Sequence, residues 1–184
     1  MKLSKDYKYN ILCEDKLTHC FIRRFLISQG VNSRKINALP LPAAGCGEQY
    51  VRTQYPKQLS YLRSTSYISN VLVVAIDADF NTCIERQKQL DEACGDAGVD
   101  KCTAKDKLLL FVPKRNIETW IKHFDGVAVD EEHDYAHFLN GHESDCYNAA
   151  DKMADEFSSP SFSSVLSSLQ FAYQEYTKLV KLIS

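Results

Sequence analysis

The sequence of 184 residues contains no apolar run that approaches the length needed to cross a bilayer. Its first ten residues are polar and carry three lysines, and no apolar signal segment follows them. We therefore expect a soluble, unexported, cytoplasmic protein with no membrane partner. The seven cysteines are odd in number and none form a C-x-x-C pair, so we expect reduced thiols rather than a disulfide framework.

Internal repeats are also lacking, and the length suits one domain with a sizeable core. The sequence contains no G-x-x-x-x-G-K-[ST] phosphate-binding loop. The short stretch from Gly45 to Gly47 is too small to cradle a nucleotide by itself. Nothing in the chain therefore predicts an ATPase activity of its own.

Charge is unevenly distributed along the chain. Residues 1–115 hold 18 Lys and Arg against 12 Asp and Glu, whereas residues 116–184 hold 4 against 12. A basic first part can attract a polyanion such as DNA or RNA, and an acidic second part would repel it. The alternative is that both parts are ordinary solvated surfaces.

Four short apolar segments predict buried strands, and helical periodicity lies between them. The predicted strands are Tyr9–Cys13, Ile36–Leu41, Val71–Ile76 and Leu108–Val112. The predicted helices between and after them are Leu17–Gln29, Glu48–Arg63, Thr82–Ala93 and Asn116–Phe124. This alternation predicts an α/β fold with a mainly parallel central sheet flanked by helices.

After Phe124 the strand signal disappears, which predicts an α/β core over residues 1–125 and an acidic helical extension over residues 126–184, packed on or beside the core. Glu131–Asn140 and Ser144–Phe157 are expected to be polar helices. Pro160 and Ser159 suit the start of a final helix, Ser161–Ile183, with a long apolar stripe. That stripe is expected to pack on the sheet; the alternative is a partner surface, including a homo-oligomer.

Acidic residues follow three of the four predicted strands. They are Glu14 and Asp15 after the first, Asp77 and Asp79 after the third, and Glu118 beyond the fourth. In a parallel sheet the loops at the carboxyl ends of the strands form the ligand crevice. Carboxylates brought together there repel one another, and a hard cation such as Mg²⁺ or Mn²⁺ relieves that repulsion. The pattern predicts a cation site for phosphodiester chemistry, with Lys114 and Arg115 as donors to phosphate.

The alternative for these acids is helix capping. Asp15 would cap the helix beginning near Leu17, and Asp79 or Asn81 would cap the helix beginning near Thr82. Capping explains one acid in each loop. It does not explain acidic pairs after two strands.

The same residues resemble the Toprim-domain family. The matching segments are Ile11–Glu14, a strand ending in Glu, and Val73–Asp77 with Asp79, an apolar strand ending in Asp-x-Asp. The sequence looks most like small divergent Toprim proteins and the nuclease half of overcoming-lysogenization-defect nucleases. Some of these carry an acid–x–Trp after a later strand, which Glu118 and Trp120 resemble. Two positions differ from the family pattern: Asp15 replaces the usual Gly, and the first Gly after Asp79 is Gly95.

The resemblance implies roles for individual residues. Glu14 would act as general acid or base or as a metal ligand, and Asp77 and Asp79 would ligate Mg²⁺ or Mn²⁺. Glu118 would be a ligand for a second metal. The implied activity is hydrolysis of DNA or RNA, and the implied partner is a separate ATPase subunit.

Other classes of protein share parts of this pattern. A receiver domain would use Glu14, Asp15, Asp77 and Lys114, but it has no use for Asp79. A haloacid-dehalogenase-type phosphatase also begins from Asp-x-Asp, yet that motif normally lies near the N-terminus. A Toprim-like module without catalytic activity that docks a protein is the non-enzymatic alternative.

A zinc site is a further alternative. Two pairs at helical spacing, His133 with His137 and His142 with Cys146, could each ligate zinc. The first pair lies among acidic residues that favour a solvated surface instead. The single Trp120 is expected to be a core residue rather than a base-stacking platform.

Overall fold

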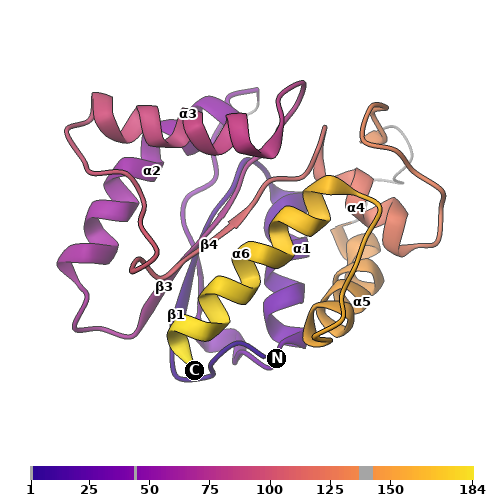
Figure 1. Ribbon diagram of the computed structural model, residues 1–184, viewed down its shortest axis with the longest axis horizontal. Helices are drawn as coiled ribbons and strands as arrows, with labels where there is room; N and C mark the ends of the chain where they lie inside the picture. Colours follow the sequence, from indigo (N-terminus) through magenta and orange to yellow (C-terminus); the bar gives the residue numbers. More distant parts are fainter. Residues whose placement is uncertain (1, 44, 137–142) are drawn as a thin grey trace.

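Residues 2–43, 45–136 and 143–184 are described by the computed structural model (Figure 1). Its regular elements are, in chain order, β1 (Lys8–Leu12), α1 (Lys16–Ser28), the 3-10 turn η1 (Ser33–Lys35), β2 (Ile36–Ala38), α2 (Gly47–Ser64), β3 (Asn70–Ala75), α3 (Cys83–Asp96), β4 (Leu108–Phe111), α4 (Ile117–Phe124), the 3-10 turn η3 (Glu143–Cys146), α5 (Tyr147–Ser158) and α6 (Ser167–Ile183).

The four strands form one parallel sheet in the order β2-β1-β3-β4. This confirms the predicted α/β class and all four predicted strands, with small differences at their ends. The second strand stops at Ala38 rather than Leu41, because Pro40 and Pro42 have no amide hydrogen to continue the ladder. The strand order reverses direction between β1 and β3, so the crevice of a doubly wound fold is expected at the carboxyl ends of these two strands.

Helices cover both faces of the sheet (Figure 1). Helices α1, α4, α5 and α6 share one hydrophobic core with one face of β1, β3 and β4. Helices α2 and α3 form a second core with the opposite face. Strand β3 is buried on both sides, as its uninterrupted β-branched sequence predicts.

The C-terminal helices are part of this architecture. Helix α5 packs against α1 and α4, and α6 lies along the edge strand β4. The apolar stripe of α6 is largely buried within the chain, including Tyr176, Leu179 and Val180. The apolar side of α6 therefore packs within the chain's own core. Dimerisation through α6 stays a prediction without structural support. Trp120 is fully buried and donates to Ser168 Oγ at 2.8 Å, which confirms it as a core residue.

Two predicted helices differ from the structure. Residues 131–136 are not an α-helix, because the Asp130 side chain accepts hydrogen bonds from the amides of Glu132 and His133 and closes a local turn. The final helix begins at Ser167 rather than Ser161. Its first amides are capped by the distant Glu131 carboxylate, which accepts from Ser167 at 3.0 Å and from Ser168 at 2.8 Å.

Residues 137–140 of the predicted helix Glu131–Asn140 lie outside the described residues, and so does His142. Each predicted zinc pair, His133 with His137 and His142 with Cys146, therefore has one member outside the described part of the chain. All seven cysteines are free thiols. Within the described ranges, no helix combines the length and apolar character needed to cross a membrane.

Candidate functional site

Glu14 and Asp77 meet at the point where the strand order reverses. Each lies just beyond the carboxyl end of its strand, β1 for Glu14 and β3 for Asp77. The Asp77 amide donates to Glu14 Oε1 at 2.7 Å. The sequence prediction that these acids share one edge of the sheet is therefore confirmed in position.

The electrostatics of this pair favour the protonated forms. Burial raises the pKa of Glu14 to about 7; the Asp77 amide opposes this shift, and the charge of Asp79 adds to it. Burial raises the pKa of Asp77 well above its ordinary value, and the charges of Glu14, Asp15, Glu118 and Asp79 raise it further. Negative charge is thus concentrated here without equivalent compensation.

Gly47 makes the position of Glu14 possible. It is the first residue of α2, and a Cβ atom at this position would lie 2.8 Å from Glu14 Cβ and 2.9 Å from Glu14 Oε2. Any larger residue would displace the carboxylate or the helix. The N-terminus of α2, with its unpaired amide groups and partial positive charge, therefore lies close to Glu14.

Asp79 is exposed and is directed toward a buried arginine. Its backbone has a φ of +53°, and its Oδ2 accepts from Arg86 Nη2 at 2.8 Å. Arg86 is only 3% exposed and also donates to Glu48 and to Gln89. In this conformation Asp79 is ion-paired within the protein, and its negative charge contributes to the raised pKa of Glu14 and of Asp77.

Glu118 lies in the first turn of α4 and is partly buried. Burial raises its pKa, and the charges of Asp15 and Asp134 add to the increase. Its own charge contributes to the raised pKa of Asp77. Glu118 therefore belongs to the same electrostatic neighbourhood as the strand-end acids.

The helix-capping alternative holds for Asp15 alone among these acids. Its side chain accepts from Thr18 N at 2.8 Å and caps α1. Helix α3 is capped by Thr82 in a reciprocal pair with Glu85, so neither Asp79 nor Asn81 has that role.

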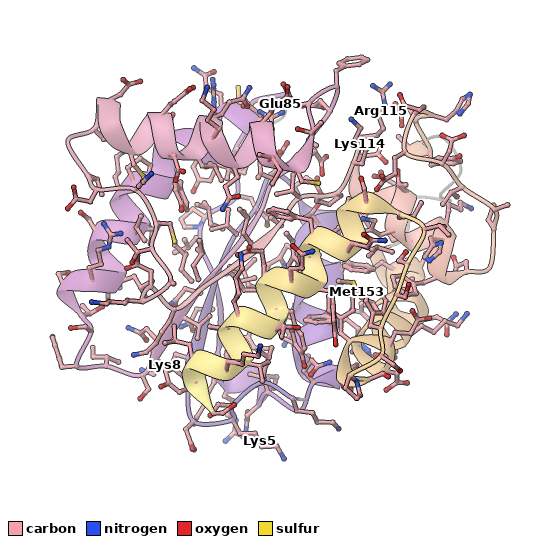
Figure 2. The ribbon with its side chains drawn as sticks, viewed as in Figure 1. Lys5, Lys8, Glu85, Lys114, Arg115 and Met153 are labelled. Carbon is pink, nitrogen blue, oxygen red and sulfur yellow. The ribbon has the colours of Figure 1, made fainter. Side chains whose placement is uncertain are left out.

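The basic pair after β4 is fixed by the loop that follows β3. Lys114 Nζ donates to the Asn81 carbonyl at 2.7 Å, so Lys114 ties the two loops together. The guanidinium carbon of Arg115 lies 4.1 Å from the centre of the Phe80 ring. Figure 2 shows Lys114 and Arg115 at the end of the molecule where Glu85 lies, opposite Lys5 and Lys8.

Sequence reasoning missed Gly47 and Arg86. Arg86 falls on the buried stripe of α3 between Cys83 and Leu90, and a charged residue on an apolar stripe was an available signal. The closeness of Gly47 to Glu14 has no local signal, because the two residues are 33 positions apart in the sequence.

Within residues 2–43, 45–136 and 143–184, no three His, Cys, Asp or Glu side chains are arranged so that together they could hold a metal ion. The donor set still suits a hard cation. Mg²⁺ commonly binds through one or two carboxylates and completes its shell with water and substrate phosphate. Glu14 and Asp77 meet that requirement, whereas a third ligand would require Asp79 or Glu118 to move.

Comparisons with protein-family models, with curated proteins and with solved structures found no match to this chain.

Proposed function

We propose that this protein is a divalent-cation-dependent hydrolase of the Toprim type that cleaves the phosphodiester backbone of nucleic acid. The observation that carries the proposal is the junction of Glu14 and Asp77, two carboxyls with raised pKa at the carboxyl ends of neighbouring parallel strands. Perturbed acids at this position of a doubly wound sheet are typical of functional sites.

Mg²⁺ or Mn²⁺ is the proposed cofactor because the donors are all oxygen atoms. Glu14 and Asp77 would hold it, with Asp79 and Glu118 as ligands for the same or a second ion. When bound, the cation would polarise the phosphoryl group and neutralise the developing charge.

The protein's own groups have separate tasks in this proposal. Glu14 Oε1 is occupied by the Asp77 amide, and a pKa of about 7 suits Glu14 for general acid or base catalysis near neutral pH. Lys114 holds the β3–α3 loop in place through Asn81 and keeps a positive charge at this edge. Arg115 supplies a second cation for the nucleic-acid backbone.

Metal-dependent cleavage tests the proposal. Wild-type protein is expected to nick plasmid or cleave single strands with Mn²⁺, and Asp77→Asn and Asp77→Ala are expected to abolish this. Asp96→Asn is the matched control, because it makes the same charge change at an exposed position of α3 far along that helix. Calorimetric titration with Mn²⁺ should show weaker binding for Asp77→Ala than for Asp96→Asn.

Glu14→Gln separates the two roles of Glu14. Unchanged Mn²⁺ affinity with lost cleavage would identify an acid–base group, and reduced affinity would identify a ligand. Undiminished cleavage by Asp77→Ala, Asp79→Ala and Glu14→Ala would refute the catalytic proposal.

The resemblance to Toprim nucleases extends the proposal to a separate ATPase subunit and to a cytoplasmic location. The cleavage assay should therefore be run with and without an ATPase that copurifies with the protein. A homo-oligomer is a weaker part of the proposal, because the apolar side of α6 is used within the chain.

A second candidate is a Toprim-like binding module without catalytic activity. The ion pair between Asp79 and Arg86 favours it, because a ligand already neutralised by the protein has less to offer a cation. The same titration decides between the two, since a module without a cation site gives equal heats for wild type and Asp77→Ala. A receiver-like role for Asp77 gains less support, because Lys114 follows the fourth strand and bonds to Asn81.

A further inference from the structure

Phe80 is a large apolar side chain that the fold leaves exposed. It follows Asp79 in the β3–α3 loop, and 86% of it is accessible to solvent. A phenyl ring can bury well over a hundred Å² when a partner covers it, so an uncovered ring is a source of binding energy. Its position directly beside the carboxylate edge makes it relevant to the site.

Arg115 presents its guanidinium to this ring from the neighbouring β4–α4 loop, 4.1 Å from the ring centre. The backbones of Asp79 and Arg115 form an antiparallel bridge. Their φ angles are +53° and +67°, and no other non-glycine residue in the described part of the chain has a positive φ. Such conformations are costly for L-residues and persist where the surroundings hold them.

The two loops are also joined on either side of this bridge. Ala78 N donates to the Pro113 carbonyl at 2.8 Å, and Lys114 Nζ donates to the Asn81 carbonyl at 2.7 Å. These bonds fix the backbones that carry Phe80 and Arg115 relative to each other and to Asp77. The ring and Arg115 therefore form a prearranged pair, which we call the Phe80–Arg115 platform.

We propose that the Phe80–Arg115 platform stacks a base of single-stranded nucleic acid and so places the adjoining phosphate at the Glu14–Asp77 junction. This deepens the proposed function by naming its substrate class, and it rests on that function. A nucleotide has a base, which stacks on an aromatic ring, and a phosphate, which pairs with a cation. The platform presents an aromatic ring and an arginine side by side and can therefore bind both groups. Bases inside a duplex are stacked on both faces, so the platform selects single strands or frayed ends.

The surroundings favour nucleic acid over a protein partner. Among the described residues of the same loop and helix start, the other large apolar side chain that is exposed is Ile84, at 65%, and charged Glu85 follows it directly. A protein interface is centred on a contiguous buried apolar core, which a single ring with one neighbour does not provide. Exposed Lys16 begins α1 at the same edge and adds positive charge.

Fluorescence anisotropy with labelled oligo-dT, oligo-U and a duplex of equal length, in Mg²⁺, tests the platform. Stacking contributes about 1–3 kcal/mol per base, so Phe80→Ala should weaken single-strand binding by roughly 5- to 150-fold. Phe80→Tyr should stay close to wild type. The matched control is Tyr67→Ala, which removes an aromatic residue that is 83% exposed in the loop before β3, at the opposite edge of the sheet. It should leave binding unchanged.

A second readout follows the stacked ring directly. In Phe80→Trp, quenching of the new indole by oligo-dT is expected, whereas Trp120 is buried and provides a constant background. Equal affinities of Phe80→Ala and Tyr67→Ala, no quenching, or duplex binding as tight as single-strand binding would each overturn the proposal. Equal affinities would leave Phe80 as a contact for a protein partner.

Failure of the platform and failure of the proposed function give different results. If Asp77→Asn still cleaves while Phe80→Trp is quenched, the catalytic assignment is wrong and the platform stands. If Asp77→Asn abolishes cleavage while Phe80→Ala neither raises KM nor weakens binding, the platform is wrong and the catalytic assignment stands.

Discussion

Half-buried carboxylates lie in different electrostatic surroundings at the two ends of the sheet. At the amino end, Asp106 lies before β4 and accepts two hydrogen bonds from Arg63, both at 2.8 Å. At the carboxyl end, Glu14 and Asp77 lie side by side, and among the described residues neither forms an ion pair with Lys or Arg. Asp106 thus has a cationic partner within the protein, whereas Glu14 and Asp77 have none among the described residues.

The pKa shifts express this difference. Burial raises the pKa of Asp106, but hydrogen bonds from Arg63 and Thr103 outweigh it and leave the pKa below its ordinary value. At the other end burial and the charges of neighbouring acids act together and raise the pKa of Glu14 and Asp77. A carboxylate that stabilises the fold is expected to look like Asp106, whereas one kept for a ligand is expected to look like Asp77.

The largest expected effect comes from making the same substitution, Asp→Asn, at each end of the sheet and comparing cleavage and stability. Asp77→Asn should reduce Mn²⁺-dependent cleavage by about 100-fold or more, because it removes a proposed ligand, and should leave stability equal or slightly higher. Asp106→Asn should leave cleavage within about twofold and lower the free energy of unfolding by about 2 kcal/mol. Urea denaturation and a plasmid-nicking assay measure the two quantities.

If Asp77→Asn and Asp106→Asn lower the free energy of unfolding to the same extent, the proposed difference between the two ends is wrong. Such a result would show that Asp77 has a structural partner. Arg63→Met provides a control for the amino end. It should reproduce most of the loss in Asp106→Asn, since it removes the other half of the same pair.

Sequence alone predicts the acid positions well, because they depend on short-range rules. The uncharged run of β3 ends at an aspartate, and parallel strands place their carboxyl ends together. The sequence also predicts the start of α3 near Thr82, but the cap is Thr82 itself, in a capping box with Glu85, rather than Asp79 or Asn81. The end of β3 and the start of α3 require only neighbours within a few residues, whereas the closeness of Glu14 to Asp77 follows from the general rule that parallel strands align their carboxyl ends.

A pH titration of stability is the next largest effect, and its sign differs between the two ends. The folded pKa of Asp106 lies below its unfolded value, so its contribution is complete above about pH 4 and is lost as the pH falls through the folded pKa. The folded pKa of Glu14 is about 7, above its unfolded value, so its contribution is complete at low pH and is lost as the pH rises toward 7.

Urea denaturation from pH 4 to pH 8 should therefore show Glu14→Gln matching wild type near pH 4 and exceeding it near pH 7.5. Saturating Mg²⁺ should narrow the difference at pH 7.5, because a cation stabilises the ionised carboxylate of the wild type. A wild type that gains stability steadily up to pH 8 without Mg²⁺ would contradict the raised pKa.

Features that depend on distant residues escaped prediction. Glu131 lies in a segment that local propensity assigns to a solvated helix, yet it caps α6 from 36 residues away. Ser159 and Pro160 satisfy the local rule for a helix start, but the cap is supplied at Ser167 instead. The partnership of Arg86 with Glu48 and Asp79 likewise joins α3 to α2 and to the β3–α3 loop, and only the assembled fold brings these residues together.

The smallest expected effect concerns two glycines that differ in what surrounds them. A Cβ at Gly47 would lie 2.8 Å from Glu14 Cβ, whereas a Cβ at Gly95, inside α3, would have no neighbour within 4 Å. Gly47→Ala should therefore lower the free energy of unfolding by about 1–3 kcal/mol through overpacking. Gly95→Ala should raise it by about 0.5–1 kcal/mol, because alanine is favoured over glycine within a helix. Mn²⁺ affinity by calorimetry should fall for Gly47→Ala and stay unchanged for Gly95→Ala. If both variants show these shifts in stability but bind Mn²⁺ as tightly as wild type, Gly47 supports only packing. The position of Glu14 would then not govern cation binding.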